Sequence, residues 1–356
     1  MRICFILPGI TNKPIGGFKI VYEYASRLAS NFDDLEITIC FLDLTYAMKQ
    51  HSQIPFLLRY PMHKYHCAKW PTWFQLPSTV KKKLILKIDD KSIPDGDWIF
   101  ATSAPTATAV AALSPTKGKK GYFIQGYETW FMPKEELHKT YNLGLTNIAV
   151  SSWLKSKVDS VSSESCFCIP NPVDSSVFYP STEIHQEANT IAVLYHTDTA
   201  KGFDYAWDAI QNAKKEVSGL HVKMFGARKK PANLPDWIDY TENATQQELF
   251  NIYNSSSAFV CASINEGYGL TCVEALACGC PLIISNFPGS YDYSRPNINS
   301  LVSPLKDSNA MAQNIVTILK KPELQKKLRK GGIETIKKIN WNSAIKKFYS
   351  LLNNSN

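Results

Sequence analysis

The chain has 356 residues, more than one hydrophobic core usually supports, so two domains are expected. Hydrophobic residues make up 44% of it and charged residues 20%, a balance that excludes a disordered protein, and no apolar run approaches the ~20 residues of a membrane-spanning helix. The formal net charge of +8 favours anionic partners such as nucleotides, nucleic acid or an acidic membrane surface, although a merely lysine-rich surface would give the same charge.

The first half of the chain alternates apolar runs with helical patterns. Residues 2–7 and 36–42 are short apolar runs typical of buried parallel strands. Between them, the Gly- and Pro-rich loop 8–17 leads into residues 18–32, whose apolar side chains recur at helical spacing. This order predicts a βαβ unit. Further expected elements are strands at 98–103, 121–125, 147–151 and 165–170 and a helix at 105–113.

A second α/β series fills the other half. Its strands are expected at 190–195, 221–226, 257–263 and 280–285, and its helices at 203–217 and 245–256, the latter with Thr245 as N-cap. The segment 171–189 is polar and contains prolines, as a linker should. We therefore predict an α/β protein with two Rossmann-like domains facing across a cleft, with ligands at the carboxyl ends of the strands. The expected domains are 1–175 and 176–335, followed by a C-terminal helix in 336–356 that packs back toward the first domain.

The cysteines and the first residues indicate a compartment. The nine cysteines are odd in number, and several, such as Cys4, Cys40 and Cys261, lie in apolar strand-like runs where a free thiol acts as a small hydrophobic group. Met1 leads directly into a strand, with no signal peptide before it. We therefore expect a reducing, cytoplasmic location.

Residues 43–97 show no regular pattern. Lysines and tryptophans between residues 64 and 83 are candidates for contact with an anionic membrane, which would place the protein peripherally on its inner face. A solvated, variable surface region is the alternative reading.

Nucleic acid is not an expected partner, because basic and aromatic residues do not interleave on a recognisable recognition module.

No metal or bound cofactor is expected. Asp95-Gly96-Asp97 has the D-x-D spacing of some metal–nucleotide sites, but it lies in a Pro-Gly turn, and turn chemistry explains it. The glycines Gly16 and Gly17 precede a helix without forming G-x-G-x-x-G, so a nicotinamide cofactor fits poorly. Their backbone amides could instead approach a phosphate.

The segment INEGYGLTCVEALACGCPLIIS, residues 264–285, carries the strongest chemical signal. Gly267 and Gly269 allow close approach of the backbone before a helix that begins near Leu270, and a helix start offers amides and positive charge to an anion such as a diphosphate-sugar. Glu266 and Glu274 lie on either side of that start, and carboxylates accept hydrogen bonds from paired sugar or ribose hydroxyls. A capping or solvent-facing Glu274 is the alternative.

Two further charged residues lie at strand-to-helix junctions. Lys201 follows the first strand of the second series and could reach a phosphate, or could simply be solvated. Glu128 follows the strand at 121–125, where a carboxylate could take a proton from an acceptor hydroxyl or stabilise developing positive charge. A cap on the following helix is the alternative role for Glu128.

With these residues in view, the chain resembles the glycosyltransferases of family four, which have the GT-B fold. The most specific match is EGYGLTCVE with ALACGCP after it, an E-x7-E segment. NPVDSSVFYP (171–180), Lys201-Gly202, Gly16-Gly17 and NINSLVSP (297–304) support it, and the match is strongest over 171–345. The resemblance makes 1–175 the acceptor side and 176–335 the nucleotide-sugar side.

The resemblance also implies roles for individual residues. Glu274 would bind the nucleotide ribose, Lys201 would neutralise the diphosphate, and Gly17 would approach it from the first domain. Glu266 would hold the donor sugar together with the amides from Gly267 through Tyr268 and Gly269 to Leu270. Members of the family usually retain anomeric configuration and need no metal.

The chain departs from the family pattern after the mid-domain strand, where many members have a histidine and this chain has Tyr127-Glu128, and at a phosphate-binding position. Members commonly have an arginine several residues before the lysine, where this chain has Tyr195 and His196. His196 or Arg228 is the candidate replacement for this arginine in the phosphate clamp. The stretch YFIQGYETWF (122–131) is similar to rhamnosyltransferases of cell-surface polysaccharide assembly.

We therefore expect a retaining, metal-independent glycosyltransferase of the hexosyltransferase type. It would move a sugar from a nucleotide diphosphate to a saccharide or lipid-linked saccharide during surface polysaccharide synthesis. The alternatives are a sugar-nucleotide epimerase or phosphorylase on the same fold, and a non-catalytic partner subunit of a glycosyltransferase.

Overall fold

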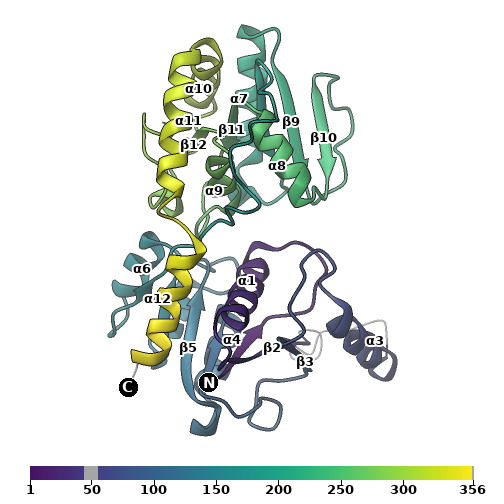
Figure 1. The fold of residues 1–356 in the computed structure, drawn as a ribbon, viewed down its shortest axis with the longest axis vertical. Helices are drawn as coiled ribbons and strands as arrows, with labels where there is room; N and C mark the ends of the chain where they lie inside the picture. Colours follow the sequence, from purple (N-terminus) through teal and green to yellow (C-terminus); the bar gives the residue numbers. More distant parts are fainter. Residues whose placement is uncertain (44–54, 355–356) are drawn as a thin grey trace. The chain divides into compact units, whose positions relative to one another are not determined.

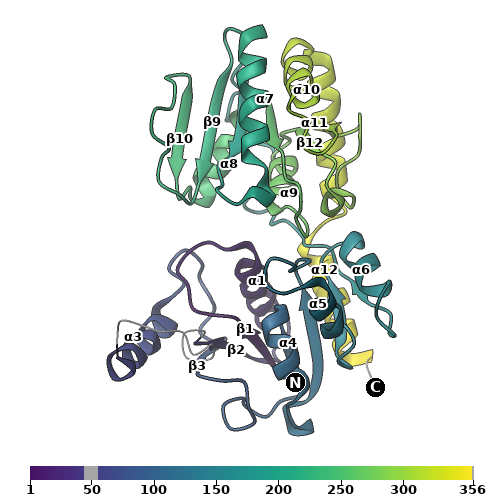
Figure 2. The same ribbon diagram turned by 180° about the vertical axis from the view of Figure 1, so that it is seen from behind.

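The computed structural model describes residues 1–43 and 55–354 and divides into two compact units. The first unit contains residues 1–169 and the chain from 345 onward, and the second contains 170–344. Each unit is built on one parallel β-sheet flanked by helices (Figures 1 and 2). The predicted α/β class, with two parallel sheets, is confirmed.

The first unit has the strand order β3-β2-β1-β4-β5-β6-β7, with parallel pairing throughout. Its strands are β1 (Arg2–Leu7), β2 (Glu36–Leu42), β3 (Lys81–Ile85), β4 (Trp98–Ala101), β5 (Lys119–Ile124), β6 (Thr146–Ala149) and β7 (Phe167–Cys168). Its helices are α1 (Gly16–Asn31), α3 (Phe56–Lys69), α4 (Ala104–Ala111), α5 (Lys134–Thr140) and α6 (Ser152–Asp159), with a 3-10 turn η1 (Pro115–Lys117). The apolar runs of β1 and β4 are buried on both faces, as the central strands of a parallel sheet should be.

Helix α12 (Trp341–Asn354) begins in the second unit and ends in the first. Phe348 is fully buried, with its ring centroid 5.2 Å from that of Phe100 and 5.0 Å from that of Tyr24. The indole Nε1 of Trp98 donates a hydrogen bond to the carbonyl oxygen of Leu352 at 3.1 Å. The last turns of the helix are therefore part of the core of the first unit.

The second unit has the strand order β10-β9-β8-β11-β12-β13, again parallel. Its strands are β8 (Thr190–Leu194), β9 (His221–Gly226), β10 (Ile238–Glu242), β11 (Ala258–Cys261), β12 (Leu282–Ser285) and β13 (Ser300–Ser303). Its helices are α7 (Phe203–Glu216), α8 (Gln246–Ser255), α9 (Leu270–Ala277), α10 (Ser308–Lys320) and α11 (Pro322–Ile336), with 3-10 turns η2 (Thr199–Lys201) and η3 (Pro288–Ser290).

Helix α8 lies in front of this sheet in Figure 1 and α7 in front of it in Figure 2, so they cover opposite faces. Thr245 caps α8 in a reciprocal pair with Glu248, as expected.

The unit boundaries differ slightly from the expected ones at 175 and 335. The backbone N–H of Val173 faces the carbonyl of Ile339 at 3.5 Å, and Val173 forms a parallel bridge with Asn340. The segment that enters the second unit near residue 173 and the segment that leaves it near residue 340 are thus paired with each other inside that unit. The chain therefore enters the second unit after residue 169 and leaves it after residue 344.

The unassigned region 43–97 contains a helix and a strand. Residues 44–54 lie outside the described part of the chain. The lysines Lys81, Lys82 and Lys83 open β3, an edge strand paired with β2, where charged side chains are well tolerated. Helix α3 includes Pro61, which disguises its pattern in the sequence. Within the described residues, no helix is both long enough and apolar enough to cross a membrane.

Candidate functional site

Two loops of the second unit are joined where β8 and β11 end. Gly202 has a φ of +62°, and a Cβ on it would lie 2.1 Å from the carbonyl oxygen of Ala262, so only glycine fits. The backbone N–H groups of Ile264 and Asn265 donate to the carbonyl oxygen of Ala200 at 2.8 and 3.2 Å. This backbone contact holds η2 beside the loop that contains the E-x7-E segment.

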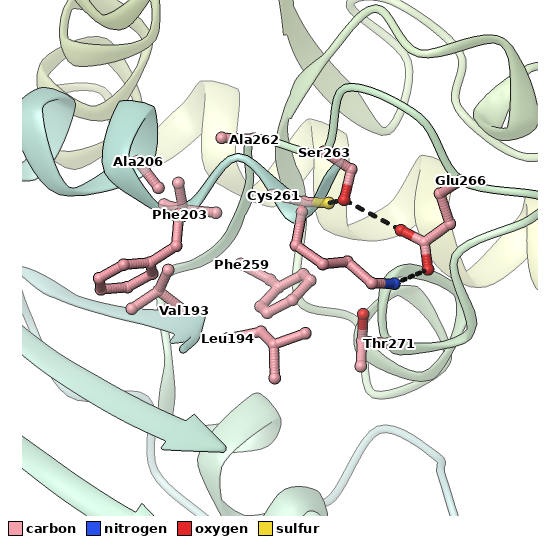
Figure 3. A pocket seen from close by; sticks show the side chains of 12 residues that line it. Val193, Leu194, Phe203, Ala206, Phe259, Cys261, Ala262, Ser263, Glu266 and Thr271 are labelled. Atoms are coloured by element: carbon pink, nitrogen blue, oxygen red, sulfur yellow. Dashed lines mark hydrogen bonds and ion pairs between the residues drawn. The ribbon is translucent and has the colours of Figure 1, made fainter. Parts of the chain in front are cut away.

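The contact between the loops brings Lys201 and Glu266 together. The Nζ of Lys201 lies 2.5 Å from Oε1 of Glu266, and Oε2 of Glu266 accepts a hydrogen bond from Oγ of Ser263 at 2.9 Å (Figure 3). The two side chains are 28% and 17% exposed. Burial lowers the pKa of Lys201, but the charge and hydrogen bond of Glu266 outweigh it and raise the pKa, so Lys201 is cationic.

A pocket surrounds this ion pair. Its polar side is formed by Lys201, Ser263, Glu266 and Thr271. The rest is mostly apolar, with contributions from Val193, Leu194, Phe203, Ala206, Phe259 and Cys261 (Figure 3). An ion pair with apolar surroundings has a strong electrostatic field, because little water screens it.

The turn before α9 requires a glycine at position 269, because of its backbone conformation and because Tyr293 lies so close. Gly269 is the N-cap of α9 with a φ of +100°, and a Cβ there would lie 2.5 Å from Oη of Tyr293. That same hydroxyl donates to the carbonyl oxygen of Tyr268 at 2.7 Å. Among the described residues, no side chain caps the N-terminus of α9. The first turn therefore keeps the character of an anion-binding helix start.

Other predicted residues of the segment take different positions. Leu270 is the first residue of α9, and Gly267 lies where the loop packs closely against Gly289. The ring of Tyr268 is buried against Tyr293, so this residue can serve a ligand through its backbone rather than its ring.

Glu274 lies on α9 and is 6% exposed. Burial is the main cause that raises the pKa of the hydroxyl of Tyr253 and of the thiol of Cys278, and the nearby charge of Glu274 raises both further. A solvent-facing Glu274, the alternative considered from the sequence, is wrong. Its role as a ribose ligand stays a prediction.

His196 and Arg228 differ as replacements for the missing arginine. Nδ1 of His196 accepts a hydrogen bond from the backbone N–H of Asp198 at 3.0 Å. Burial and the positive charge of Lys201 lower the pKa of His196, and Arg228 lowers it further, so the imidazole is neutral near pH 7. Arg228 is exposed in the loop after β9. Of the two, only Arg228 retains the positive charge that a phosphate clamp needs.

The predicted residues of the first unit gather where β1, β4 and β5 end. Gly16 and Gly17 open α1, and the side-chain amide of Gln125 donates from Nε2 to the carbonyl oxygen of Gly17 at 3.0 Å. A Cβ on Gly17 would lie 3.5 Å from the nearest described atoms, an ordinary contact. Protein packing alone does not demand a glycine there.

Glu128 is half-buried, and its Oε2 accepts a hydrogen bond at 2.6 Å from the backbone N–H of Ala104, at the start of α4. It therefore caps an earlier helix rather than the one that follows, α5, whose N-cap is Pro133. Burial raises the pKa of Glu128 from 4.5 to about 7, partly opposed by the Ala104 hydrogen bond. A carboxylate with such a pKa can exchange a proton near neutral pH.

We expect Glu128→Gln to stabilise the protein at high pH. With its pKa at about 7 in the folded state and 4.5 as reference, Glu128 stabilises the fold fully below pH 4.5 and less as the pH rises through 7. Glutamine can accept the same hydrogen bond without becoming charged. Urea unfolding should therefore show Glu128→Gln more stable than wild type by roughly 1–3 kcal/mol above pH 7, with little difference below pH 4.5. A difference independent of pH would contradict the raised pKa.

Sequence reasoning missed two supporting residues. Ser263 orients Glu266, and Gln125 binds the backbone of Gly17. Gln125 directly follows β5 and Ser263 lies two residues after the end of β11, and this position at the carboxyl end of a parallel strand was the signal that could have identified them. Among the described residues, no group of three or more His, Cys, Asp or Glu side chains is arranged to hold a metal ion.

The match to a protein family lies in the second unit. The model of the family described as Glycosyl transferases group 1 matches residues 178–335, which include Lys201, Glu266 and Glu274. An uncharacterized glycosyltransferase of Methanocaldococcus jannaschii, MJ1178, is 23% identical over 210 residues, 56% of either chain. A D-inositol 3-phosphate glycosyltransferase of Streptomyces bingchenggensis is 29% identical over 109 residues, 31% of this chain and 24% of that protein. The chain thus spans about half, or less, of the length of these curated relatives.

Similarity to solved structures extends over the whole chain. TarM of S. aureus, in a complex that contains UDP, has a TM-score of 0.75 at 12% identity and covers 99% of both chains. Anabaena HepE, in complex with UDP-glucose, has a TM-score of 0.73 at 12% identity, also over 99% of both chains. The fold of this chain is therefore that of these GT-B proteins.

Proposed function

We propose that this chain, which belongs over residues 178–335 to the group 1 glycosyltransferases, transfers a sugar from a nucleotide diphosphate to an acceptor. The observation that carries the proposal is the Lys201–Glu266 pair beside the uncapped start of α9. A cation and a helix N-terminus together suit a diphosphate, and a neighbouring carboxylate suits sugar hydroxyls.

The pair suggests how a donor would be bound. Without a ligand, Lys201 and Glu266 neutralise each other at 2.5 Å. A diphosphate would compete for Lys201, and Glu266 would then accept hydrogen bonds from the hydroxyls of the donor sugar. UDP and UDP-glucose in complexes of TarM and HepE support a nucleotide-diphosphate donor here. Lys201, Arg228 and the start of α9 would balance the phosphate charge without a metal ion.

In the reaction, the bond between C1 of the donor sugar and the diphosphate breaks, and an acceptor hydroxyl oxygen bonds to C1. The hydroxyl proton leaves, and Glu128, with a pKa of about 7, is the candidate to accept it. Positive charge on Lys201 stabilises the departing diphosphate. We propose retention of configuration, as the E-x7-E segment suggests.

The acceptor is proposed to be a saccharide or lipid-linked saccharide of a surface polysaccharide. The support is the resemblance to family four, whose members often act on lipid-linked or growing polysaccharides. The resemblance of YFIQGYETWF to rhamnosyltransferases favours rhamnose as the donor sugar. Activity in the cytoplasm, peripherally at the membrane, would follow from such an acceptor.

Calorimetric titration with nucleoside diphosphates and their sugar conjugates tests the donor site. We expect one nucleotide to bind at micromolar to sub-millimolar strength, and Glu274→Gln to weaken it about tenfold, because glutamine loses the charge that holds the ribose hydroxyls. Glutamine nearly preserves the shape of this buried side chain, so thermal unfolding should be nearly unchanged. If no nucleotide bound to a folded wild-type protein, the donor site would be refuted.

Product analysis separates the proposed reaction from its alternatives. Transfer to an added saccharide identifies a glycosyltransferase. Isomerisation or hydrolysis without an acceptor would indicate an epimerase, and phosphate-dependent cleavage a phosphorylase. Binding without any turnover would indicate a non-catalytic subunit.

A further inference from the structure

One tryptophan differs from the rest in its exposure. All eight tryptophans lie in the described part of the chain, and only Trp130, at 71%, is strongly exposed. The adjacent Phe131 is 45% exposed. Exposed neighbouring aromatic side chains are costly to solubility and commonly mark a binding surface.

The backbone holds these two rings outward. Residues 128–132 form a turn in which the carbonyl oxygen of Glu128 accepts from the N–H groups of Phe131 and Met132 at 3.0 and 3.4 Å. A Cβ on Gly126 would lie 2.8 Å from Cη2 of Trp130, so the indole rests against the backbone at Gly126. The glycine therefore sets where the indole lies.

Polar residues precede the aromatic pair along the chain, and Cγ of Glu128 and the ring of Trp130 both lie close to Gly126. Gln125 binds the backbone of Gly17, and Glu128 binds the backbone of Ala104, as described above. Tyr127 follows Gly126, and its hydroxyl lies 2.7 Å from Nε2 of His138. Aromatic rings beside hydroxyl and carboxylate groups at the carboxyl ends of parallel strands form a typical small-molecule surface.

The local charge argues against an anionic membrane as the partner. Lys134 and Lys139 are balanced by Glu135 and Glu136, and Lys139 pairs with Glu136 at 2.6 Å. Anionic lipid surfaces attract segments with a net excess of lysine and arginine. A neutral partner with both apolar and hydrogen-bonding faces fits this surface better.

We propose that Trp130 and Phe131 form a stacking platform for a neutral sugar ring of the acceptor saccharide. A pyranose ring has an apolar C–H face that can lie on an indole, while its hydroxyls bond to polar groups at the rim. The proposal rests on the glycosyltransferase function proposed above and identifies the part of the first unit that recognises the acceptor.

Saturation-transfer NMR on the full chain tests the platform, with neutral trisaccharides of glucose, galactose, N-acetylglucosamine and rhamnose as probes. We expect at least one probe to receive saturation from the protein, and Trp130→Ala to weaken its affinity about tenfold. Phe167→Ala is the matched control, because Phe167 is a 49% exposed aromatic on the edge strand β7 of the same unit, and it should leave binding unchanged. Gly126→Ala should also weaken binding, because the added methyl group displaces the indole.

Several outcomes would overturn the platform: binding of no probe to the wild type, equal binding by Trp130→Ala, or equal losses in Trp130→Ala and Phe167→Ala. Trp130-dependent binding to phosphatidylglycerol vesicles without saccharide binding would identify a membrane contact instead. The nucleotide titration gives a separate result. If a nucleotide binds but no saccharide does, the platform fails alone; if a saccharide binds but no nucleotide does, the glycosyltransferase proposal fails and saccharide recognition stands.

Discussion

Replacing Lys201 with methionine is expected to slow sugar transfer by about a hundredfold or more. Methionine approximates the length of the lysine stem and removes the charge that would stabilise a departing diphosphate. The loss should appear mainly in kcat, because charge develops on the leaving group in the transition state. Steady-state kinetics with the donor found by titration measures it.

Lys201 also neutralises Glu266, so stability and catalysis must be separated. Lys201→Met alone leaves Glu266 without its cation, and adding Glu266→Gln removes that uncompensated charge. We expect the double variant to recover much of any lost stability and none of the activity. Lys223→Met is a suitable control, since Lys223 forms a 2.6 Å ion pair with Glu187 in the same unit, outside the pocket around Lys201. Recovery of activity in the double variant would mean that Lys201 acts only as a structural partner.

Gly269→Ala is expected to destabilise the protein strongly. The residue would be held at a φ of +100° with its Cβ 2.5 Å from Oη of Tyr293 and 3.3 Å from Cζ of Phe287. Both rings are fully buried and have little room to move. Backbone strain and overpacking together should lower the free energy of unfolding by roughly 3–5 kcal/mol, measured from urea midpoints.

A second glycine separates strain from overpacking. Gly144 has a φ of +71°, and a Cβ there would meet no described atom within 4 Å. Gly144→Ala should therefore cost only about 1–2 kcal/mol of backbone strain. Combining Gly269→Ala with Tyr293→Phe removes the closest atom, so the double variant should lose less stability than the two single changes summed. Equal losses in Gly269→Ala and Gly144→Ala would show that the Tyr293 contact is unimportant.

Much of the fold could be predicted because the central strands are buried on both faces. Residues 2–7 and 280–285 read as continuous apolar runs, and they form β1 and β12. The edge strand β3 could not be predicted in this way. One side of an edge strand is not paired within the sheet, so Lys81 to Lys83 can remain hydrated while their backbone pairs with β2.

The candidate site could be predicted residue by residue but not as an arrangement. The spacing of Glu266 and Glu274 and the position of Lys201 identified the residues. The ion pair, however, joins positions 65 residues apart and depends on how closely the backbone of Gly202 approaches Ala262. Such a contact has no local sequence pattern. The exposure of Trp130 was equally hidden, because an aromatic residue after a buried strand more often continues into the core.

The path of the chain through its two units has a consequence for biosynthesis. Residues 170–344 form the second unit as one uninterrupted segment, whereas the first unit needs both ends of the chain. Phe348, against Phe100 and Tyr24, and the Trp98–Leu352 hydrogen bond complete its interior. On the ribosome, the unit synthesised first is therefore the unit finished last. Its apolar interior stays open until helix α12 has been synthesised, and during that interval the exposed apolar surface favours aggregation.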